Sequence, residues 1–337
     1  MKFWDREKEK AWLKRYLQTE PNAILFVYGP KSSGKSTLMY QVVKELSRRK
    51  RFVKRYDVYW YDLRGIMIRS YGDIVDIFFD PESKEGQKVI RDAEVYLGIP
   101  NIAGFRVGKK VYEELRGREI DPFRYMEAVL MRSGKRHIVV FDELQKLKDV
   151  YLNGDSKQRP LVKELFNFFV RLTKVLHLAH VIVMTSDTFF IEEVYTDSTL
   201  KNTSRFYLVD FFDDDTAVKI LVEEGLDEGT AKEIVRQAGG VPWIMEEVVE
   251  GDSPMETLKE IYEQYSSRLY EAVRNREDLK KLLKRAIEGE NLYYADRDIE
   301  AVKELVDNEV LFYDPIGKDV RFQTRLDERA VRELLNL

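Results

Sequence analysis

A glycine-rich segment between an apolar run and a helical pattern is the feature that most restricts how this chain can fold. Residues 29–36 read GPKSSGKS and match the pattern G-x-x-x-x-G-K-[ST] in full. The apolar run 23–28 enters this segment as a strand, and a helical pattern from Lys35 to about Lys50 leaves it. In such a unit the N–H groups of the loop point inward and surround phosphate groups. The sequence therefore predicts a phosphate-binding loop at the start of an α/β domain.

Two side chains of this loop have predicted roles in binding ATP with magnesium. Lys35 would bridge the β- and γ-phosphates as a point charge, and the Ser36 hydroxyl would be a ligand of Mg²⁺. An ordinary strand–turn–helix is the alternative, and the complete match in this context disfavours it. The residues predicted to bind the nucleotide here are Gly29, Pro30, Lys31, Ser32, Ser33, Gly34, Lys35, Ser36 and Thr37.

A pair of acidic residues follows a second apolar run, in the segment HIVVFDE at 137–143. A buried parallel strand presents the residues at its carboxyl end to the ligand, so this segment resembles a Walker B strand. Asp142 would hold the Mg²⁺ through water, and Glu143 would orient and polarise the attacking water. An acidic pair alone is weak evidence, because helix N-termini often begin in this way. The phosphate-binding loop upstream makes the catalytic interpretation the stronger one.

Two further residues are weaker candidates for contact with the γ-phosphate. Ser186, with Thr185 as the second choice, follows the apolar run 181–184, and its alternative role is the N-cap of the next helix. Arg205 precedes the run 206–209 and would act as an arginine finger, in its own chain or in a neighbouring one. A plain surface salt bridge is the alternative that we favour for Arg205.

Short apolar runs alternate with longer helical patterns along the first two thirds of the chain. Continuous apolar runs are typical of strands that are buried on both faces of a parallel sheet. A long insertion, 64–136, separates the second run from the third. The five predicted strands are 23–28, 58–63, 138–141, 181–184 and 206–209.

The last third of the chain is predicted to be mainly helical. Helices at 216–224 and 230–238 end at a Gly-Gly-Val-Pro stop, 239–242, and indicate a small helical lid over 213–254. The segment 255–337 reads as helices followed by a hairpin, which describes a winged helix. Its predicted helices are 255–272, 277–288 and 298–308, and its hairpin strands are 310–313 and 320–324.

Composition excludes several classes of protein. The 337 residues include no Cys, so neither a disulfide framework nor a thiolate metal site can form. A formal net charge of −4 does not suggest a protein held mainly by nucleic-acid phosphates. No apolar run approaches the roughly 18 residues of a membrane span, so we expect a soluble cytoplasmic protein. An Asn-Lys-x-Asp motif is absent, which argues against a GTPase.

Taken together, these motifs resemble the archaeal ATPase family of the STAND class, which is related to AAA+ proteins and origin-recognition initiators. The resembling segments are FWDREKE at 3–9, DELQ at 142–145, SRF at 204–206, GGVPW at 239–243 and the hairpin 311–322. The resemblance implies that Phe3, Arg6 and Pro242 lie near the adenine. This chain departs from the family at Ser204, where Gly is usual, and at 185–186, where members often have Gly-Ser.

We therefore expect an α/β P-loop ATPase core over 1–212, with strand order 5-1-4-3-2, a helical lid and a C-terminal winged helix. The expected cofactors are ATP or ADP and Mg²⁺. The leading functional hypothesis is an ATP-dependent switch with slow hydrolysis and a protein partner. A nucleic-acid-dependent ATPase of the initiator or helicase-loader kind is the alternative. A module that binds ATP without useful hydrolysis is a third, and the presence of Lys35, Asp142 and Glu143 weakens it.

Charge separates the first two hypotheses. The predicted reading helix of the winged helix, 296–309, carries six acidic residues against Arg297 and Lys303. Such a surface repels phosphates, so a protein contact is preferred there. A basic stretch at 48–55 ends the helix after the phosphate loop, where cations complement the helix dipole. We interpret it as a solvated helix end rather than as a nucleic-acid patch.

Overall fold

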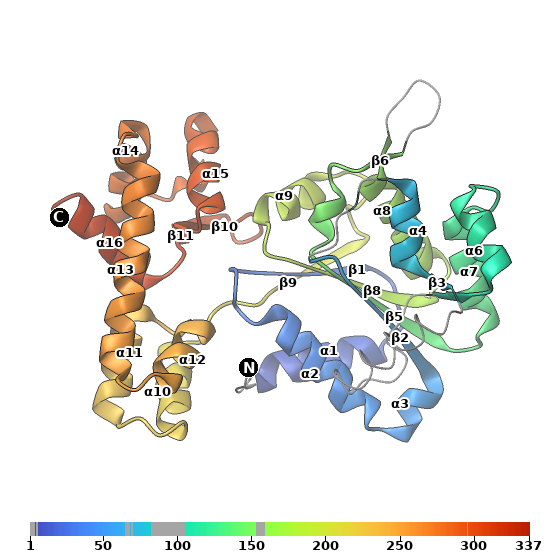
Figure 1. Ribbon diagram of the computed structural model, residues 1–337, viewed down its shortest axis with the longest axis horizontal. Coiled ribbons are helices and arrows are strands. Elements are labelled where there is room, and N and C mark those ends of the chain that lie inside the picture. Colours follow the sequence, from blue (N-terminus) through green and yellow to red (C-terminus); the bar gives the residue numbers. More distant parts are fainter. Residues whose placement is uncertain are drawn as a thin grey trace.

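The computed structural model describes residues 4, 6–64, 68, 70–81, 105–152, 159–294 and 296–337. An α/β core and a largely helical C-terminal part lie side by side in it (Figure 1). None of the helices in the described ranges is both long and apolar enough to cross a membrane.

The core is built on a parallel sheet of five strands with the order β2-β5-β8-β1-β9. Read from β9, this is the order predicted for the five apolar runs. All residues of β1 and β8 are buried, which explains why the sequence of these strands is apolar throughout. The bounds are β1 Ile24–Tyr28, β2 Tyr56–Asp62, β5 Arg136–Asp142, β8 Ala179–Thr185 and β9 Ser204–Leu208.

Helices cover both faces of the sheet because successive strand residues point to opposite sides. Leu25 and Val27 of β1 pack in one apolar cluster with α1, α2 and α3, whereas Ile24 and Phe26 pack in another with α4, α7, α8 and α9 (Figure 1). On the first face lie α1 Glu7–Gln18, α2 Lys35–Ser47 and α3 Lys50–Arg55. On the second lie α4 Tyr71–Phe78, α7 Pro122–Arg132, α8 Leu161–Val170 and α9 Thr188–Thr196.

The insertion predicted at 64–136 adds helices beside the second face of the sheet. Within the insertion, residues 79–81 and 105–107 form a short parallel pair of strands. Leu115 of helix α6 belongs to the same apolar cluster as α4 and α8. The remaining elements of the insertion are β3 Phe79–Pro81, β4 Phe105–Val107 and α6 Lys109–Arg116. Outside the insertion, after β5, a second small pair of strands is formed by β6 Tyr151–Leu152 and β7 Arg159–Pro160.

One apolar cluster, from Ala217 to Val331, runs through the whole C-terminal part. The predicted boundary between lid and winged helix, at 254–255, therefore lies inside a shared core. Two helices were missed by the sequence analysis, α12 and α16. The elements are α10 Asp214–Glu223, α11 Glu228–Ala238, α12 Pro242–Glu250, α13 Pro254–Val273, α14 Glu277–Ile287, α15 Ile299–Asp307, β10 Leu311–Asp314, β11 Asp319–Phe322 and α16 Arg325–Leu334.

Candidate nucleotide-binding site

The loop between β1 and α2 has a backbone that requires glycine at two positions. Gly29 has φ 151°, and a Cβ atom there would overlap the carbonyl oxygen of Val209. Gly34 has φ 86° and immediately precedes α2, whose first residue is Lys35. Left-handed backbone of this kind is strained for residues with a side chain. The glycines of the motif are therefore explained by backbone geometry as well as by room for phosphate.

Lys35 lies buried inside this loop. Its Nζ donates hydrogen bonds to the carbonyl oxygens of Gly29, at 3.1 Å, and Pro30, at 2.8 Å. Burial lowers the pKa of Lys35 to about 8, while the nearby carboxylates of Glu143 and Asp142 act in the opposite direction. The ammonium group therefore lies inside the loop, and its contact with the phosphates stays a prediction.

The predicted metal ligands Ser36 and Asp142 are brought together at the carboxyl edge of the sheet. The Ser36 Oγ donates to Asp142 Oδ2 at 2.7 Å, and Asp142 is only 3% exposed. Burial raises the pKa of Asp142, and the hydrogen bond from Ser36 and the charge of Arg64 counteract this effect. One Arg64 Nη2 donates to both Ser36 Oγ and Asp142 Oδ2. The sequence analysis did not single out Arg64, although it lies just beyond the second predicted strand.

The oxygen atoms of Ser36 and Asp142 suit a magnesium ion. They are hard donors of the kind that Mg²⁺ prefers, and they already hold a cation, because the Arg64 guanidinium stands in this position. Within the described ranges no group of three or more His, Asp or Glu side chains gathers as a metal cage. Magnesium would thus be held by Ser36 and Asp142 together with the phosphates of a nucleotide, as is usual for this ion.

Hydrogen bonds connect Glu143 through Gln145 to Thr185, the last residue of β8. It has left-handed backbone, φ 63°, directly after β5, and its Oε2 accepts a hydrogen bond from Gln145 Nε2. The Oγ1 of Thr185 donates to Gln145 Oε1 at 2.8 Å and in turn accepts from the N–H of Asp187 at 2.9 Å. The side chain linked to the acidic pair at the end of β8 is therefore Thr185, the second choice of the sequence analysis.

Ser186 is half-buried beside Thr185. The interpretation of Ser186 as the N-cap of the next helix is wrong, because Asp187 caps α9 by accepting a hydrogen bond from the N–H of Phe190 at 2.9 Å. Its predicted contact with the γ-phosphate stays a prediction.

Arg6 donates hydrogen bonds to the backbone of the phosphate loop and of the segment that follows β9. Its Nη2 donates to the carbonyl oxygens of Ser33, at 3.0 Å, and Asp210, at 2.6 Å, and its guanidinium lies 4.3 Å from the centre of the Phe212 ring. Phe212 also pairs through its backbone with Gly240, where its N–H donates to the carbonyl oxygen at 2.9 Å. Arg6 thereby connects the loop to the segment that leads into the C-terminal part.

The other residues implied to lie near the adenine are less fully described. Phe3 lies outside the described residues. Pro242 is buried at the first position of α12, two residues after Gly240. Contact of Arg6 and Pro242 with the adenine stays a prediction.

Arg205 is not brought to the phosphate loop of its own chain. It lies opposite Leu25 near the beginning of β9, whereas the loop follows Tyr28 at the other end of β1. Its exposed guanidinium lies 5.9 Å from the centre of the Tyr16 ring in α1. No ion pair of Arg205 is found among the described residues, so the favoured salt bridge is absent there. The role of Arg205 toward a neighbouring chain remains a prediction.

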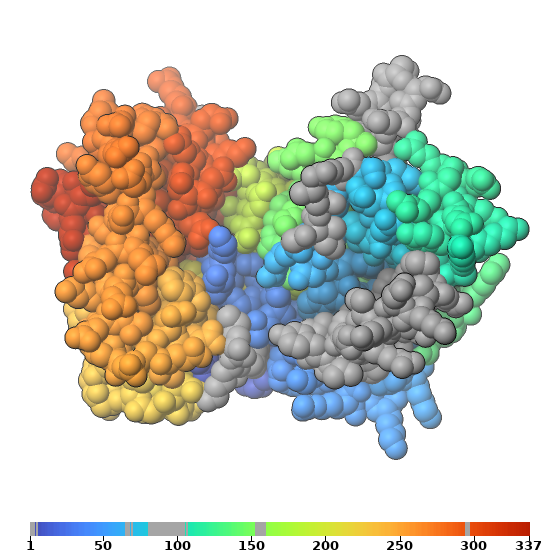
Figure 2. Space-filling model, in the orientation of Figure 1, coloured from blue at the N-terminus to red at the C-terminus, as the bar shows by residue number. Residues whose placement is uncertain are grey.

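The C-terminal part bonds to the residue that precedes the phosphate loop and to one residue within the loop. The Tyr28 hydroxyl donates to the buried Asp314 Oδ1 at 2.9 Å, and Lys31 forms an ion pair with Glu309. Asp314 Oδ1 also accepts from the backbone N–H groups of Ile316 and Gly317, at 3.0 and 2.9 Å. In Figure 2 the C-terminal part, orange to red, lies directly against the core. Sequence analysis predicted Lys31 as a nucleotide ligand and could not reveal this contact.

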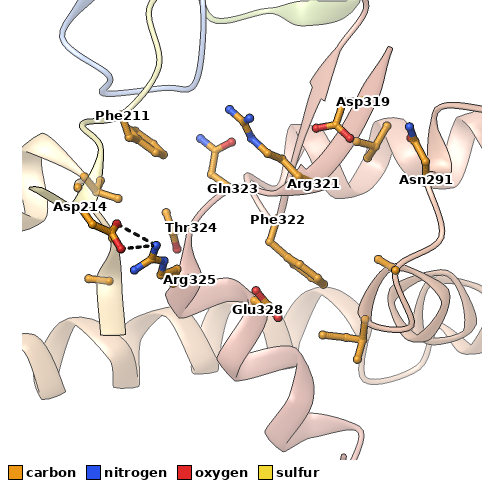
Figure 3. A pocket seen from close by; sticks show the side chains of 18 of the residues that line it. Phe211, Asp214, Asn291, Asp319, Arg321, Phe322, Gln323, Thr324, Arg325 and Glu328 are labelled. Atoms are coloured by element: carbon orange, nitrogen blue, oxygen red, sulfur yellow. Dashed lines mark hydrogen bonds and ion pairs between the residues drawn. The ribbon is translucent and has the colours of Figure 1, made fainter. Parts of the chain in front are cut away.

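Of two cavities nearby, one lies at this contact and the other is lined by the C-terminal part and the segment that leads into it. One of about 310 Å³ is lined by Lys31 and Ser32 of the phosphate loop, together with Trp243, Tyr265 and Arg268 of the C-terminal part. The larger one, about 610 Å³, includes no residue of the loop. Figure 3 shows that Arg321, Gln323 and Arg325 project around it from the hairpin and the start of α16, where Arg325 pairs with Asp214 at 2.9 Å. The predicted phosphate-binding residues Lys31 and Ser32 therefore line the smaller cavity.

Comparison with known proteins agrees with this geometry. Residues 3–248 match the model of an ATPase domain found predominantly in Archaea. An uncharacterised ATP-binding protein of Methanocaldococcus jannaschii is 37% identical over 353 residues, which cover 99% of this chain and 95% of the relative. A protein of the same description from Pyrococcus abyssi is 31% identical over 347 residues, covering 99% of each chain.

Two solved structures share the fold over nearly the whole chain. The Walker-type ATPase of Pyrococcus abyssi has a TM-score of 0.62 at 18% identity, covering 98% of this chain and 96% of its own. The ORC2 protein of Aeropyrum pernix, solved as ADPNP–ADP complexes, has a TM-score of 0.54 at 12% identity, covering 99% and 95%. At these identities the likeness concerns the fold alone.

Proposed function

The chain belongs to the family of ATPase domains found predominantly in Archaea, and we propose that it binds ATP with magnesium and hydrolyses it slowly as a conformational switch. The observation that carries this proposal is the direct bonding of the C-terminal part to Tyr28, which precedes the phosphate loop, and to Lys31, which lies within it. In this proposal 213–254 forms a lid and 255–337 a winged helix of the STAND kind, and both respond to the nucleotide.

The residues of the core divide the chemistry among them. The loop N–H groups and Lys35 would bind the phosphates, and Ser36 and Asp142 would hold the metal. Magnesium, when bound, neutralises charge on the β- and γ-phosphates. Glu143 orients the attacking water and accepts its proton, while Gln145 and Thr185 fix the position of the Glu143 carboxylate.

Competition for Lys31 and a direct link through Tyr28 are the physical basis of the switch. Lys31, which forms an ion pair with Glu309, is also a predicted phosphate ligand, so a nucleotide phosphate would compete with Glu309 for the charge of its ammonium group. Tyr28 is the last residue of β1 and directly precedes the loop. A movement of the loop would therefore displace Tyr28 and alter the hydrogen bond between Tyr28 and Asp314. A protein partner would bind the surface that is exposed when the hairpin leaves the core.

We expect Asp314→Ala to accelerate the release of ADP. The substitution removes the acceptor of the Tyr28 hydroxyl and of two backbone N–H groups, and an unpaired buried donor costs about 1–3 kcal/mol, or roughly 5- to 150-fold in rate if the closed state is affected alone. Release of a fluorescent ADP analogue is measured by stopped flow. Tyr28→Phe, which leaves the turn intact, should shift the rate in the same direction by less.

Asp319→Ala is the matched control, because Asp319 lies opposite Asp314 in the same hairpin and forms no ion pair in the described part of the chain. Equal release rates for wild-type, Asp314→Ala and Tyr28→Phe proteins would contradict the switch. Nucleotide affinity too weak to measure in the wild type would contradict the proposed ATP binding itself.

A second candidate, a nucleic-acid-dependent ATPase, is favoured by one feature of the surface. Six exposed cations at and before α3 form no ion pair among the described residues, whereas many surface cations elsewhere do, as Lys232 does with Glu228. The helix expected to read DNA, α15, contacts the core of the same chain, since Lys303 lies 5.8 Å from the centre of the Phe189 ring in α9. The six cations are Arg48, Arg49, Lys50, Arg51, Lys54 and Arg55.

We expect the full-length protein to bind duplex DNA no tighter than micromolar at about 0.15 M salt, and its ATPase rate not to rise with DNA or RNA. Fluorescence anisotropy with a labelled duplex and phosphate release measure the two quantities. Tight, salt-sensitive binding that is lost in Arg48→Glu/Arg51→Glu would establish the second candidate instead. Lys174→Glu/Lys201→Glu makes the same charge change at exposed positions elsewhere and should leave any binding unaltered.

A further inference from the structure

The side chain of Arg64 lies in the position that the proposed function assigns to a metal ion. A single nitrogen, Nη2, donates to both oxygens expected to bind magnesium, Ser36 Oγ and Asp142 Oδ2. Glu143, the neighbouring acid, is bonded to Gln145 instead. Arg64 therefore interacts with the metal-binding pair rather than with the residue that orients water.

The sheet itself places Arg64 there. Strands β2 and β5 are parallel neighbours, with Asp62 opposite Asp142, and the N–H of Leu63 donates to the carbonyl oxygen of Asp142 at 3.0 Å. The Arg64 N–H donates to Asp62 Oδ1 at 2.9 Å, which holds the backbone just beyond the strand. From this point the side chain reaches across the end of β5 to the buried carboxylate.

Arg64 and Asp142 differ in solvent exposure, and this difference would allow the guanidinium to be replaced by a metal ion. The side chain of Asp142 is 4% exposed, whereas that of Arg64 is 50% exposed. A buried carboxylate without a cation is costly, and Arg64 is the cation within ion-pair distance of Asp142 in the described part of the chain. Because the guanidinium covers Asp142 from the solvent side, it can leave without any rearrangement of the sheet.

We propose that Arg64 is a built-in competitor of magnesium, which neutralises Asp142 in the metal-free site and is displaced when the metal arrives with the nucleotide. A guanidinium and a magnesium ion, with or without a bridging water, cannot both occupy the space beside Ser36 Oγ and Asp142 Oδ2, because the two cations would overlap and repel each other. The inference rests on the proposed nucleotide binding and adds to it a cation exchange at Ser36 and Asp142.

The exchange has two consequences of opposite sign. Without Arg64, magnesium meets no competitor, so a lower concentration of Mg²⁺ should half-saturate nucleotide binding. In the absence of metal, however, the uncompensated Asp142 carboxylate repels the phosphates, so nucleotide should bind more weakly than to the wild type. A residue with only a structural role would not move these two quantities in opposite directions.

The test uses the full chain and the variant Arg64→Ala, with binding of fluorescent ADP followed by anisotropy across a Mg²⁺ titration and in EDTA. The half-saturating Mg²⁺ concentration is expected to fall roughly tenfold, and the affinity in EDTA to fall by a similar factor, as for loss of one charge-assisted hydrogen bond. Arg64→Gln retains donors but no charge and should act in the same direction. Arg132→Ala, which removes an exposed charge elsewhere on the core, should match the wild type.

A second readout needs no nucleotide. Mn²⁺ added to the nucleotide-free protein, with free Mn²⁺ measured by electron paramagnetic resonance, should bind more tightly to Arg64→Ala than to the wild type. Adding Asp142→Asn should remove the gain. An unchanged or raised Mg²⁺ requirement, together with unchanged Mn²⁺ binding, would overturn the inference. If neither the wild type nor Arg132→Ala bound nucleotide, this would count against the proposed function. The Mn²⁺ result would still decide the role of Arg64.

Discussion

Glu143→Gln is expected to bind ATP as the wild type does and to lose nearly all turnover. The amide can still accept the hydrogen bond from Gln145, so the local structure should persist, but it cannot take a proton from water. Loss of a positioned general base lowers rates by on the order of 10²–10⁴-fold. Calorimetric affinity and single-turnover phosphate release measure the two effects separately.

Lys35→Ala is the companion variant and should fail at the earlier step. It removes the buried ammonium that the loop carbonyls of Gly29 and Pro30 hold in place, so binding itself should be lost. Wild-type turnover in Glu143→Gln would contradict the water-orienting role. Wild-type affinity in Lys35→Ala would instead contradict the position of the phosphates.

Gly240→Ala is expected to destabilise the junction between the core and the C-terminal part. A Cβ atom at Gly240 would overlap the backbone of Phe212, the residue with which Gly240 forms its isolated bridge. Forcing an atom into such a contact typically costs about 1–3 kcal/mol. Thermal unfolding should therefore begin several degrees lower. Nucleotide affinity should fall as well, because Arg6 contacts both the Phe212 ring and the loop carbonyl of Ser33.

Gly229→Ala provides the comparison within the same part of the chain. Gly229 lies in the first turn of α11, and its nearest neighbour is the end of a side chain, Asp227 Oδ1, at 3.2 Å. The added methyl group should change the unfolding midpoint little. If Gly240→Ala were as stable as Gly229→Ala and bound nucleotide equally well, the bridge to Phe212 would not support the site.

Most of the core could be predicted because its signals are local. A strand buried on both faces must be apolar throughout, so β1 and β8 are visible as continuous runs in the sequence. The positions of Lys35, Ser36 and Asp142 follow from motifs attached to the ends of such runs. Their meeting, with Ser36 Oγ 2.7 Å from Asp142 Oδ2, was therefore expected before the structure was known.

Two helices of the C-terminal part were missed although signals for them were present. Thr324 and Asp327 form a capping box at the start of α16, a pattern that can be found by inspection. Pro242 occupies the first position of α12, where proline is well tolerated, but in the sequence it was interpreted as part of the stop of the preceding helix. In each case the residues at the helix start were first assigned to another element, Thr324 to a hairpin strand and Pro242 to a helix stop.

The sequence by itself determined the α/β core, the phosphate-binding loop and the acidic pair, because each depends on residues that are close along the chain. Only the tertiary structure decided that Arg64 covers the metal-binding pair and that Asp314 holds Tyr28. Residues 64 and 142 meet through the register of β2 and β5, and residues 28 and 314 meet because the C-terminal part packs on the core. No local pattern encodes such pairs, since the geometry that joins them arises when the whole chain has folded.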